Sequence, residues 1–120
     1  YLTTDIRVHE GTLRLTHKQM KRVNEYILAH LAEPLSLETL AQQIGYSAYH
    51  FARLFRETTN ITPHQFVLSK RLERAEYLLA ETNLPLSQVT LEVGFQSQSH
   101  FTQAFKSLFG VTPRQYRQRS

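Results

Sequence analysis

The polar side chains with the most distinctive chemistry lie at matching places in two similar segments of the chain. In the first segment, the guanidinium of Arg53 can donate two parallel hydrogen bonds, which suit the two acceptors on the edge of a guanine. In the second segment, the amides of Gln98 and Gln103 can bond adenine in the major groove. The chemistry that these residue types offer is hydrogen bonding to base edges rather than catalysis.

Outward positions on two short helices define the full set of base-edge candidates. If Phe51, Leu54 and Phe55 pack inward, the residues between them on the same helix must face solvent. The candidates are Ala48, Tyr49, Ala52 and Arg53 in the first segment, and Gln96, Gln98, Ser99 and Gln103 in the second. The helix of the second segment has no outward arginine. We therefore expect it to read bases more weakly than the first helix, or to contact mainly the DNA backbone. A solvated charge or a phosphate contact is the alternative for Arg53.

A second set of residues is suited to phosphate oxygens. Helix N-termini present free backbone amides and the positive end of the helix dipole, and both favour anions. Lysine and arginine side chains near the recognition helices add positive charge. The phosphate candidates are Ser36, Leu37, Arg56, Lys106, Thr112, Arg114 and Arg117.

Histidines and phenylalanines in the two segments favour structural roles. His50 and His100 each precede a core phenylalanine, and we expect their imidazoles to pack against a turn, with a phosphate contact as the alternative. Pairs of phenylalanines four residues apart are more typical of a core than of a stacking platform for single strands. The six histidines lack the spacing of metal ligands, so we expect no metal and no cofactor.

The longest expected helix carries a cluster of charges with two interpretations. Lys70, Arg71 and Arg74 are accompanied by Glu73 and Glu76, which is typical of a solvated face. Part of this face could instead touch a protein partner, and the sequence does not decide between the two.

Composition limits the class of protein. The chain has 120 residues, 41% of them apolar and 20% charged, as in ordinary globular domains. It has no cysteine and no apolar run of the roughly 18 residues that would indicate a membrane span. A net charge of +4 and a C-terminal stretch without acidic residues, Lys106–Ser120, favour a polyanion as partner. Since the chain begins at Tyr1 rather than Met, we expect a fragment of a longer protein. With no membrane span and no pattern of a signal peptide, we expect a cytoplasmic protein without a membrane partner.

Capping residues predict the elements that position these side chains. Thr16 with Gln19 and Thr62 with Gln65 form capping boxes, and Pro63 suits the first position of a helix. Two further helices flank a glycine turn, with cap and turn residues at Ser36, Gly45 and Ser47. The helix that begins at residue 63 runs to about residue 81, which gives about 28 Å at 1.5 Å per residue.

An internal repeat sets the predicted architecture. A shift of 49 residues aligns Gly45 with Gly94, and after the turn a shift of 50 aligns His50 with His100. The predicted fold is all-α, with two helix-turn-helix subdomains joined by a long connecting helix. We place a leader at 1–15, the first subdomain at 16–62, the connecting helix at 63–81 and the second subdomain at 82–120. Such a helix suits two recognition helices about one turn of DNA, near 34 Å, apart.

The most specific pattern is the stretch GFQSQSHFTQAFKSLFGVTPRQY, from Gly94 to Tyr116. The first copy, GYSAYHFARLFRETTNITPHQF, follows the same pattern more loosely. These stretches resemble the signature of AraC/XylS-family transcription regulators, and the resemblance covers roughly Thr16–Arg119. It departs at Thr90, where the family usually has alanine and a threonine could loosen packing. It also departs at Asn60, which replaces a usual glycine but tolerates the same left-handed backbone.

The resemblance implies a DNA-binding domain of a bacterial, nucleoid-associated transcription regulator that binds double-stranded DNA. Matching family positions support the base-edge candidates given above. Family members usually carry a separate sensing or dimerisation domain, so any dimerisation is expected through a domain absent from this chain. They often activate through contacts with RNA polymerase, for which the charged face of the connecting helix could serve. The DNA site and the choice between activation and repression stay open.

Two other classes of protein compete with this interpretation. A helical protein-interaction module would bind with little sensitivity to salt or to Arg53→Ala. DNA binding, in contrast, weakens with salt at a logarithmic slope of about −0.9 per neutralised phosphate. An enzyme has little support, because the sequence has no glycine-rich phosphate loop, no cysteine and no recognisable Ser-His-Asp arrangement.

Overall fold

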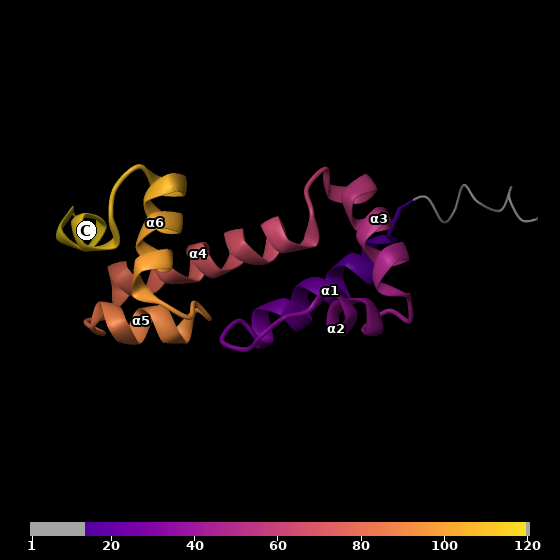
Figure 1. Ribbon diagram of the computed structural model, residues 1–120, viewed down its shortest axis with the longest axis horizontal. Coiled ribbons are helices and arrows are strands. Elements are labelled where there is room, and N and C mark those ends of the chain that lie inside the picture. Colours follow the sequence, from indigo (N-terminus) through magenta and orange to yellow (C-terminus); the bar gives the residue numbers. More distant parts are fainter. Residues whose placement is uncertain (1–13, 120) are drawn as a thin grey trace, which may run out of the picture. The chain divides into compact units, whose positions relative to one another are not determined.

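The computed structural model describes residues 14–119, so the predicted leader lies almost entirely outside the described residues. All regular elements within that range are helices (Figure 1). They are α1 (His17–Ala29), α2 (Leu37–Gln42), α3 (Ala48–Thr59), α4 (Pro63–Glu81), α5 (Leu86–Glu92), α6 (Gln98–Phe109) and α7 (Pro113–Arg119). The predicted all-α fold class is confirmed. None of these described helices is long and apolar enough to cross a membrane.

The packing of the backbone in space divides the chain into two compact units. Among the described residues, the first unit consists of 14–29 and Leu35–Phe66, and the second of His30–Pro34 and 67–119. Each unit holds one helix-turn-helix pair, α2 with α3 in the first and α5 with α6 in the second. The turn between α1 and α2 therefore belongs to the second unit, although its neighbours in the sequence belong to the first.

Four helices begin directly after their predicted caps, Thr16, Ser36, Ser47 and Thr62. In contrast, α2 ends at Gln42, with Gln43 rather than Gly45 as its C-cap, and α5 begins after Pro85 without a side-chain cap. Thr16 and Gln19 exchange hydrogen bonds of 2.9 and 3.0 Å at the start of α1, and the same pair of bonds recurs at α4 and α7. Asn60 and Gly110 end α3 and α6 with φ values of 68° and 80°. Local sequence alone therefore determines these ends, as expected for capped helices.

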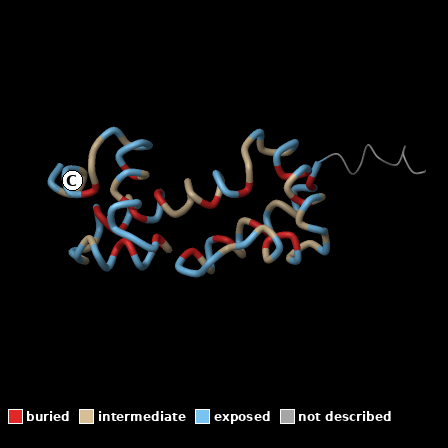
Figure 2. The backbone as a smooth tube through the Cα atoms, in the orientation of Figure 1, coloured by how far each residue is buried: buried red, intermediate tan, exposed pale blue. Residues whose placement is uncertain are grey.

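Each unit buries a pair of phenylalanines from its second helix-turn-helix element. The rings of Phe51 and Phe55 in α3 are fully buried with centroids 5.6 Å apart, and those of Phe101 and Phe105 in α6 are 5.9 Å apart. Figure 2 shows buried positions recurring between exposed ones along the helices. Burying one such side chain stabilises a fold by about 1.5–3 kcal/mol, so these pairs anchor both helices.

Thr90 is buried in the core of the second unit with its hydroxyl hydrogen-bonded. The residue is 3% exposed, and its Oγ1 donates a hydrogen bond of 2.8 Å to the carbonyl of Leu86 in the same helix. Its own carbonyl accepts the Phe95 N–H at 3.0 Å. The buried hydroxyl is therefore satisfied inside α5.

Arg117 closes the C-terminal end of α4. Its guanidinium donates to the carbonyl of Leu84, just after the helix, at 2.5 Å. It also donates to the carbonyls of Leu79 and Thr82 at 3.3 Å each and of Leu78 at 3.5 Å. Carbonyls at the end of a helix lack partners within the helix and carry its negative partial charge. This differs from the phosphate contact expected for Arg117, because its donors are engaged inside the second unit.

We expect Arg117→Ala to lower the free energy of unfolding by about 1–2 kcal/mol, since charged hydrogen bonds to several carbonyls are lost from a partly exposed site. Urea unfolding measures this change. The matched control is Arg119→Ala, an exposed arginine of the same helix, which should leave the midpoint unchanged. Equal midpoints for both variants would contradict the capping role.

The two turn glycines should differ in their tolerance of a side chain. Gly45 has a φ of 73° and open space around it, so Gly45→Ala should cost only the left-handed strain of about 1–2 kcal/mol. Gly94 has a φ of 87°, and a Cβ there would overlap the Leu31 carbonyl oxygen and lie 3.0 Å from the Arg71 guanidinium. Gly94→Ala should therefore cost clearly more, about 3 kcal/mol or above, in thermal or urea unfolding. Equal costs at both positions would show that the Gly94 turn is not closely packed.

Candidate nucleic-acid interface

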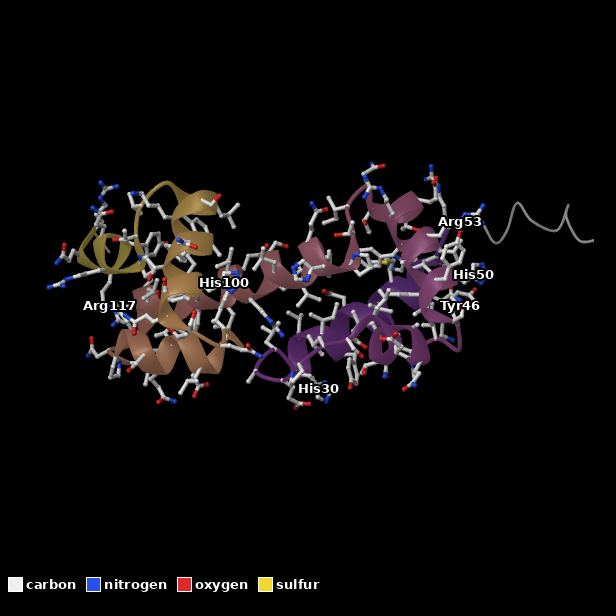
Figure 3. All side chains as sticks on the ribbon, viewed as in Figure 1. His30, Tyr46, His50, Arg53, His100 and Arg117 are labelled. Atoms are coloured by element: carbon white, nitrogen blue, oxygen red, sulfur yellow. The ribbon has the colours of Figure 1, made fainter. Side chains whose placement is uncertain are left out.

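The helix α3 presents one polar face because its opposite face is fixed in the core. The Ser47 side chain caps the helix by accepting the N–H of His50 at 3.2 Å. Tyr49 is 78% exposed, and Arg53, one turn later, is also exposed (Figure 3). The small residues of this surface are half-buried and would let a partner approach closely; they are Ala48 and Ala52.

The helix α6 repeats this arrangement with different side chains. Ser97 accepts the N–H of His100 at 3.1 Å and so begins the helix as Ser47 begins α3. The exposed polar residues of this surface include one in the turn before the helix and three on the helix itself: Gln96, Gln98, Ser99 and Gln103. The structure therefore places all eight base-edge candidates on or just before two equivalent helices, at least partly exposed.

The longer side chains on these two helices keep their donors free of described partners. Within residues 14–119, neither the Arg53 nor the Arg56 side chain forms a hydrogen bond or an ion pair with another described residue. The same is true of Lys106, Gln98 and Gln103. Donors without internal partners can bond a ligand without first breaking a protein contact.

The imidazoles of both histidines pack against an aromatic ring of the preceding turn. The ring centroids of His50 and Tyr46 are 4.8 Å apart, and those of His100 and Phe95 are 5.3 Å apart in an edge-on arrangement. This is the packing expected from the sequence. Each histidine thus packs against the turn that precedes its own helix, α3 or α6.

At the start of α7, two backbone N–H groups that could bind an anion are already used in capping. The Thr112 N–H donates to Gln115 Oε1 at 2.9 Å, and the Gln115 N–H donates to Thr112 Oγ1 at 3.1 Å. The next residue, Pro113, has no N–H. The exposed Arg114 is therefore the phosphate candidate at this end whose amide and side chain have no partner among the described residues.

At the start of α2, the Ser36 side chain accepts the Thr39 N–H at 3.1 Å and shares a second hydrogen bond with the Thr39 hydroxyl at 2.8 Å. The amide of Leu37 has no acceptor among the described residues. The Ser36 hydroxyl is thus committed to capping, and Leu37 retains its donor.

Two arginines that sequence reasoning did not select hold backbone carbonyls. Arg22 Nε donates to the Gln43 carbonyl at 2.6 Å, and Arg71 Nη2 donates to the Glu33 carbonyl at 2.9 Å. Arg71 Nε is buried with no hydrogen-bond partner among the described residues, and burial lowers the pKa of this guanidinium. Arg71 is therefore not part of a solvated face. The signal in the sequence is that the two arginines are 49 residues apart, the shift that aligns the two turn glycines.

The other charged residues around Arg71 divide between surface and fold. Lys70 Nζ lies 3.5 Å from the Glu73 carboxylate, and Arg74 covers a neighbouring tyrosine ring at 5.2 Å. Glu76 instead accepts the Tyr116 hydroxyl at 2.8 Å, and this hydrogen bond, together with burial and the carboxylate charge, raises the pKa of Tyr116. Only part of the expected solvated face is thus available to a partner.

The chemistry that this surface offers is hydrogen bonding and positive charge. In the part of the chain that the structure describes, no group of three or more histidine, aspartate or glutamate residues is placed to hold a metal ion. The exposed groups on α3 and α6 are a guanidinium, a phenol, amides and a hydroxyl, which suit base edges.

Sequence comparison relates the chain to known regulators. A family model described as a helix-turn-helix domain matches residues 40–119. The chain is 38% identical over 119 residues to the probable transcriptional regulator LumQ of Photobacterium leiognathi, covering 95% of this chain and 48% of that protein. It is 34% identical over 108 residues to the HTH-type transcriptional regulator ArgR of Pseudomonas aeruginosa, covering 90% of this chain and 33% of that protein. The chain thus spans half or less of the length of these relatives.

Solved structures agree with this relationship. A transcriptional regulator from Chromobacterium violaceum, described as an AraC-type DNA-binding domain-containing protein, matches with a TM-score of 0.80 and 31% identity, over 85% of this chain and 91% of that one. The DNA-binding domain of AdpA, solved in complex with a target DNA, matches with a TM-score of 0.79 and 30% identity, over 84% and 91% of the two chains. This fold is that of a DNA-binding regulator domain and not of an enzyme. The chain belongs to the AraC-type helix-turn-helix DNA-binding domains.

Proposed function

We propose that this chain binds double-stranded DNA sequence-specifically as part of a bacterial transcription regulator, with α3 and α6 entering adjacent segments of the major groove. The observation that carries the proposal is the matched presentation of the two helices. Each is capped by a serine, anchored by two buried phenylalanines and exposed on its other face. The similar domain of AdpA, which was solved with a target DNA, supports DNA as the partner.

The two helices take unequal parts in base recognition. Arg53 donates to the two acceptors of a guanine, while Tyr49 packs on a thymine methyl or bonds a base or phosphate. Ala48 and Ala52 allow close approach of the helix to the groove. On α6, Gln98 and Gln103 read adenine, with Gln96 and Ser99 beside them. Because α6 offers amides and no arginine, its readout is the weaker one.

Phosphate contacts position the domain on DNA. Arg56 and Lys106 occupy equivalent exposed sites in the last turns of α3 and α6, and Arg114 adds a third positive charge on α7. The Leu37 amide at the start of α2 supplies a backbone donor. Ser36 and Thr112 act through the caps that order these helix starts, and Arg117 is not included because it is bonded to α4.

The whole protein is proposed to contain a second domain besides this DNA-binding one. Since the relatives are two to three times as long as the part that matches, a sensing or dimerisation domain is proposed to lie outside the sequence given. The exposed part of the α4 face, which includes Glu73 and Arg74, is proposed to contact RNA polymerase. A protein of this kind acts in the cytoplasm, at the nucleoid, and needs no cofactor to bind DNA.

Selection of bound duplexes from a random DNA pool at near-physiological salt tests the proposal. Two enriched boxes about 10 base pairs apart would support entry of both helices into adjacent major-groove segments. A single box would restrict base reading to one unit. Binding that is insensitive to salt and to sequence would overturn the proposal and favour a protein-interaction module.

Arg53→Ala should cost about 1–3 kcal/mol of binding free energy and relax specificity at one base pair, because a bidentate base contact is lost. The matched control is Arg56→Ala, which should weaken binding to all sequences alike and reduce the salt slope by about 1. Fluorescence anisotropy with a set of single-base variants of the selected site measures both effects. If Arg53→Ala weakened every variant equally, Arg53 would be a phosphate contact.

A further inference from the structure

The segment between α1 and α2 forms a seat for the second helix-turn-helix. His30–Pro34 belongs to the second unit, and Leu31 within it is only 7% exposed. The Leu31 carbonyl oxygen occupies the space where a Cβ on Gly94 would lie. The turn between α5 and α6 is therefore packed directly against a backbone segment from the first third of the chain.

Arg71 ties this seat to the turn. Its Nη2 donates to the Glu33 carbonyl at 2.9 Å, while its Cζ and Nε lie 3.0 Å from the position of a Cβ on Gly94. The guanidinium thus lies between His30–Pro34 and the turn. Its Nε has no hydrogen-bond partner among residues 14–119, and burial lowers the pKa of the guanidinium. The position of this group therefore carries a desolvation cost.

The repeat gives Arg71 a counterpart in the first unit. Arg22 is 49 residues earlier, and its Nε donates at 2.6 Å to the Gln43 carbonyl, at the end of α2. Gln43 begins the turn that contains Gly45, so Arg22 braces the turn of its own unit directly. Arg71 lies against Gly94, the counterpart of Gly45, but donates its hydrogen bond to Glu33 in the segment His30–Pro34. The two arginines therefore brace the two turns by different means.

We infer that Arg22 and Arg71 are positioning residues for base readout, each for the helix-turn-helix of its own unit, and that His30–Pro34 completes the second one. This inference rests on the proposed function. A recognition helix reads bases only if its turn holds it at a fixed angle, and small displacements cost much of the discrimination between bases. Neither arginine needs to touch DNA for this effect.

A crossed pair of variants tests the inference on the full chain. Three duplexes are compared: one with both selected boxes intact, and two in which one box is replaced by an unrelated sequence. Discrimination at a box is the affinity for the intact duplex divided by the affinity for the duplex in which that box is replaced. Arg71→Ala should lower discrimination at the box read by α6 about tenfold and leave the other box unchanged. Arg22→Ala should give the reverse pattern. The matched control is Arg74→Ala, an exposed arginine one turn from Arg71, which should change neither ratio.

Conservative variants separate positioning from loss of folding. Arg71→Lys keeps a donor that can reach the single Glu33 carbonyl and should restore most of the discrimination. Arg71→Gln lacks the charge and the reach, and it carries the same test if Arg71→Ala does not fold. Equal losses at both boxes, or no loss at either, would overturn the inference.

Amide chemical shifts of the free protein give a readout that does not depend on DNA. Arg71→Gln should shift the Gly94 and Phe95 signals and leave those of Gly45 and Tyr46 in place, whereas Arg22→Ala should do the opposite. Should the unmodified chain select no boxes, the proposed function fails and readout positioning fails with it. The chemical shifts then test only whether each arginine braces the turn of its own unit. Unchanged signals would overturn that part of the inference as well.

Discussion

The burial of two phenylalanines one helical turn apart is the constraint on which the rest of each unit depends. Phe51 and Phe55 in α3, like Phe101 and Phe105 in α6, are completely enclosed. Removing one such ring costs about 3–5 kcal/mol, which is a large part of the stability of a small domain. A helix fixed at two points on one face cannot rotate about its axis. The exposure of the residues on the other face therefore follows from packing that those residues take no part in.

The two copies of the repeat share this constraint and differ where it does not act. Caps, turn glycines and enclosed rings correspond between the units, whereas Arg53 corresponds to Gln103 and Tyr49 to Ser99. Outward residues contribute little to stability, so they can change while the scaffold stays the same. One scaffold thus presents a guanidinium and a phenol in one unit and amides and a hydroxyl in the other.

Features set by neighbours in the sequence were predictable, and those set by long side chains were not. The capping box at Thr16, the start of α4 at Pro63 and the left-handed residue Asn60 depend on contacts within about four residues. The base-edge candidates followed from helical periodicity in the same way. Arg71 and Arg117 reach carbonyls 33 to 39 residues away. Periodicity tells which face an arginine occupies, but not which distant carbonyl lies within its reach.

The inserted segment His30–Pro34 has a consequence for how such domains can be recombined. Because five residues of the second unit lie between the helices α1 and α2, the chain crosses between the units three times rather than once. A hybrid regulator could be assembled by joining one protein up to residue 66 to another from residue 67. Its segment His30–Pro34 would then come from one parent and the Gly94 turn that packs against it from the other. Under the proposed function, target specificity is therefore exchanged most simply by replacing outward side chains, since a cut in the backbone also separates parts of one core.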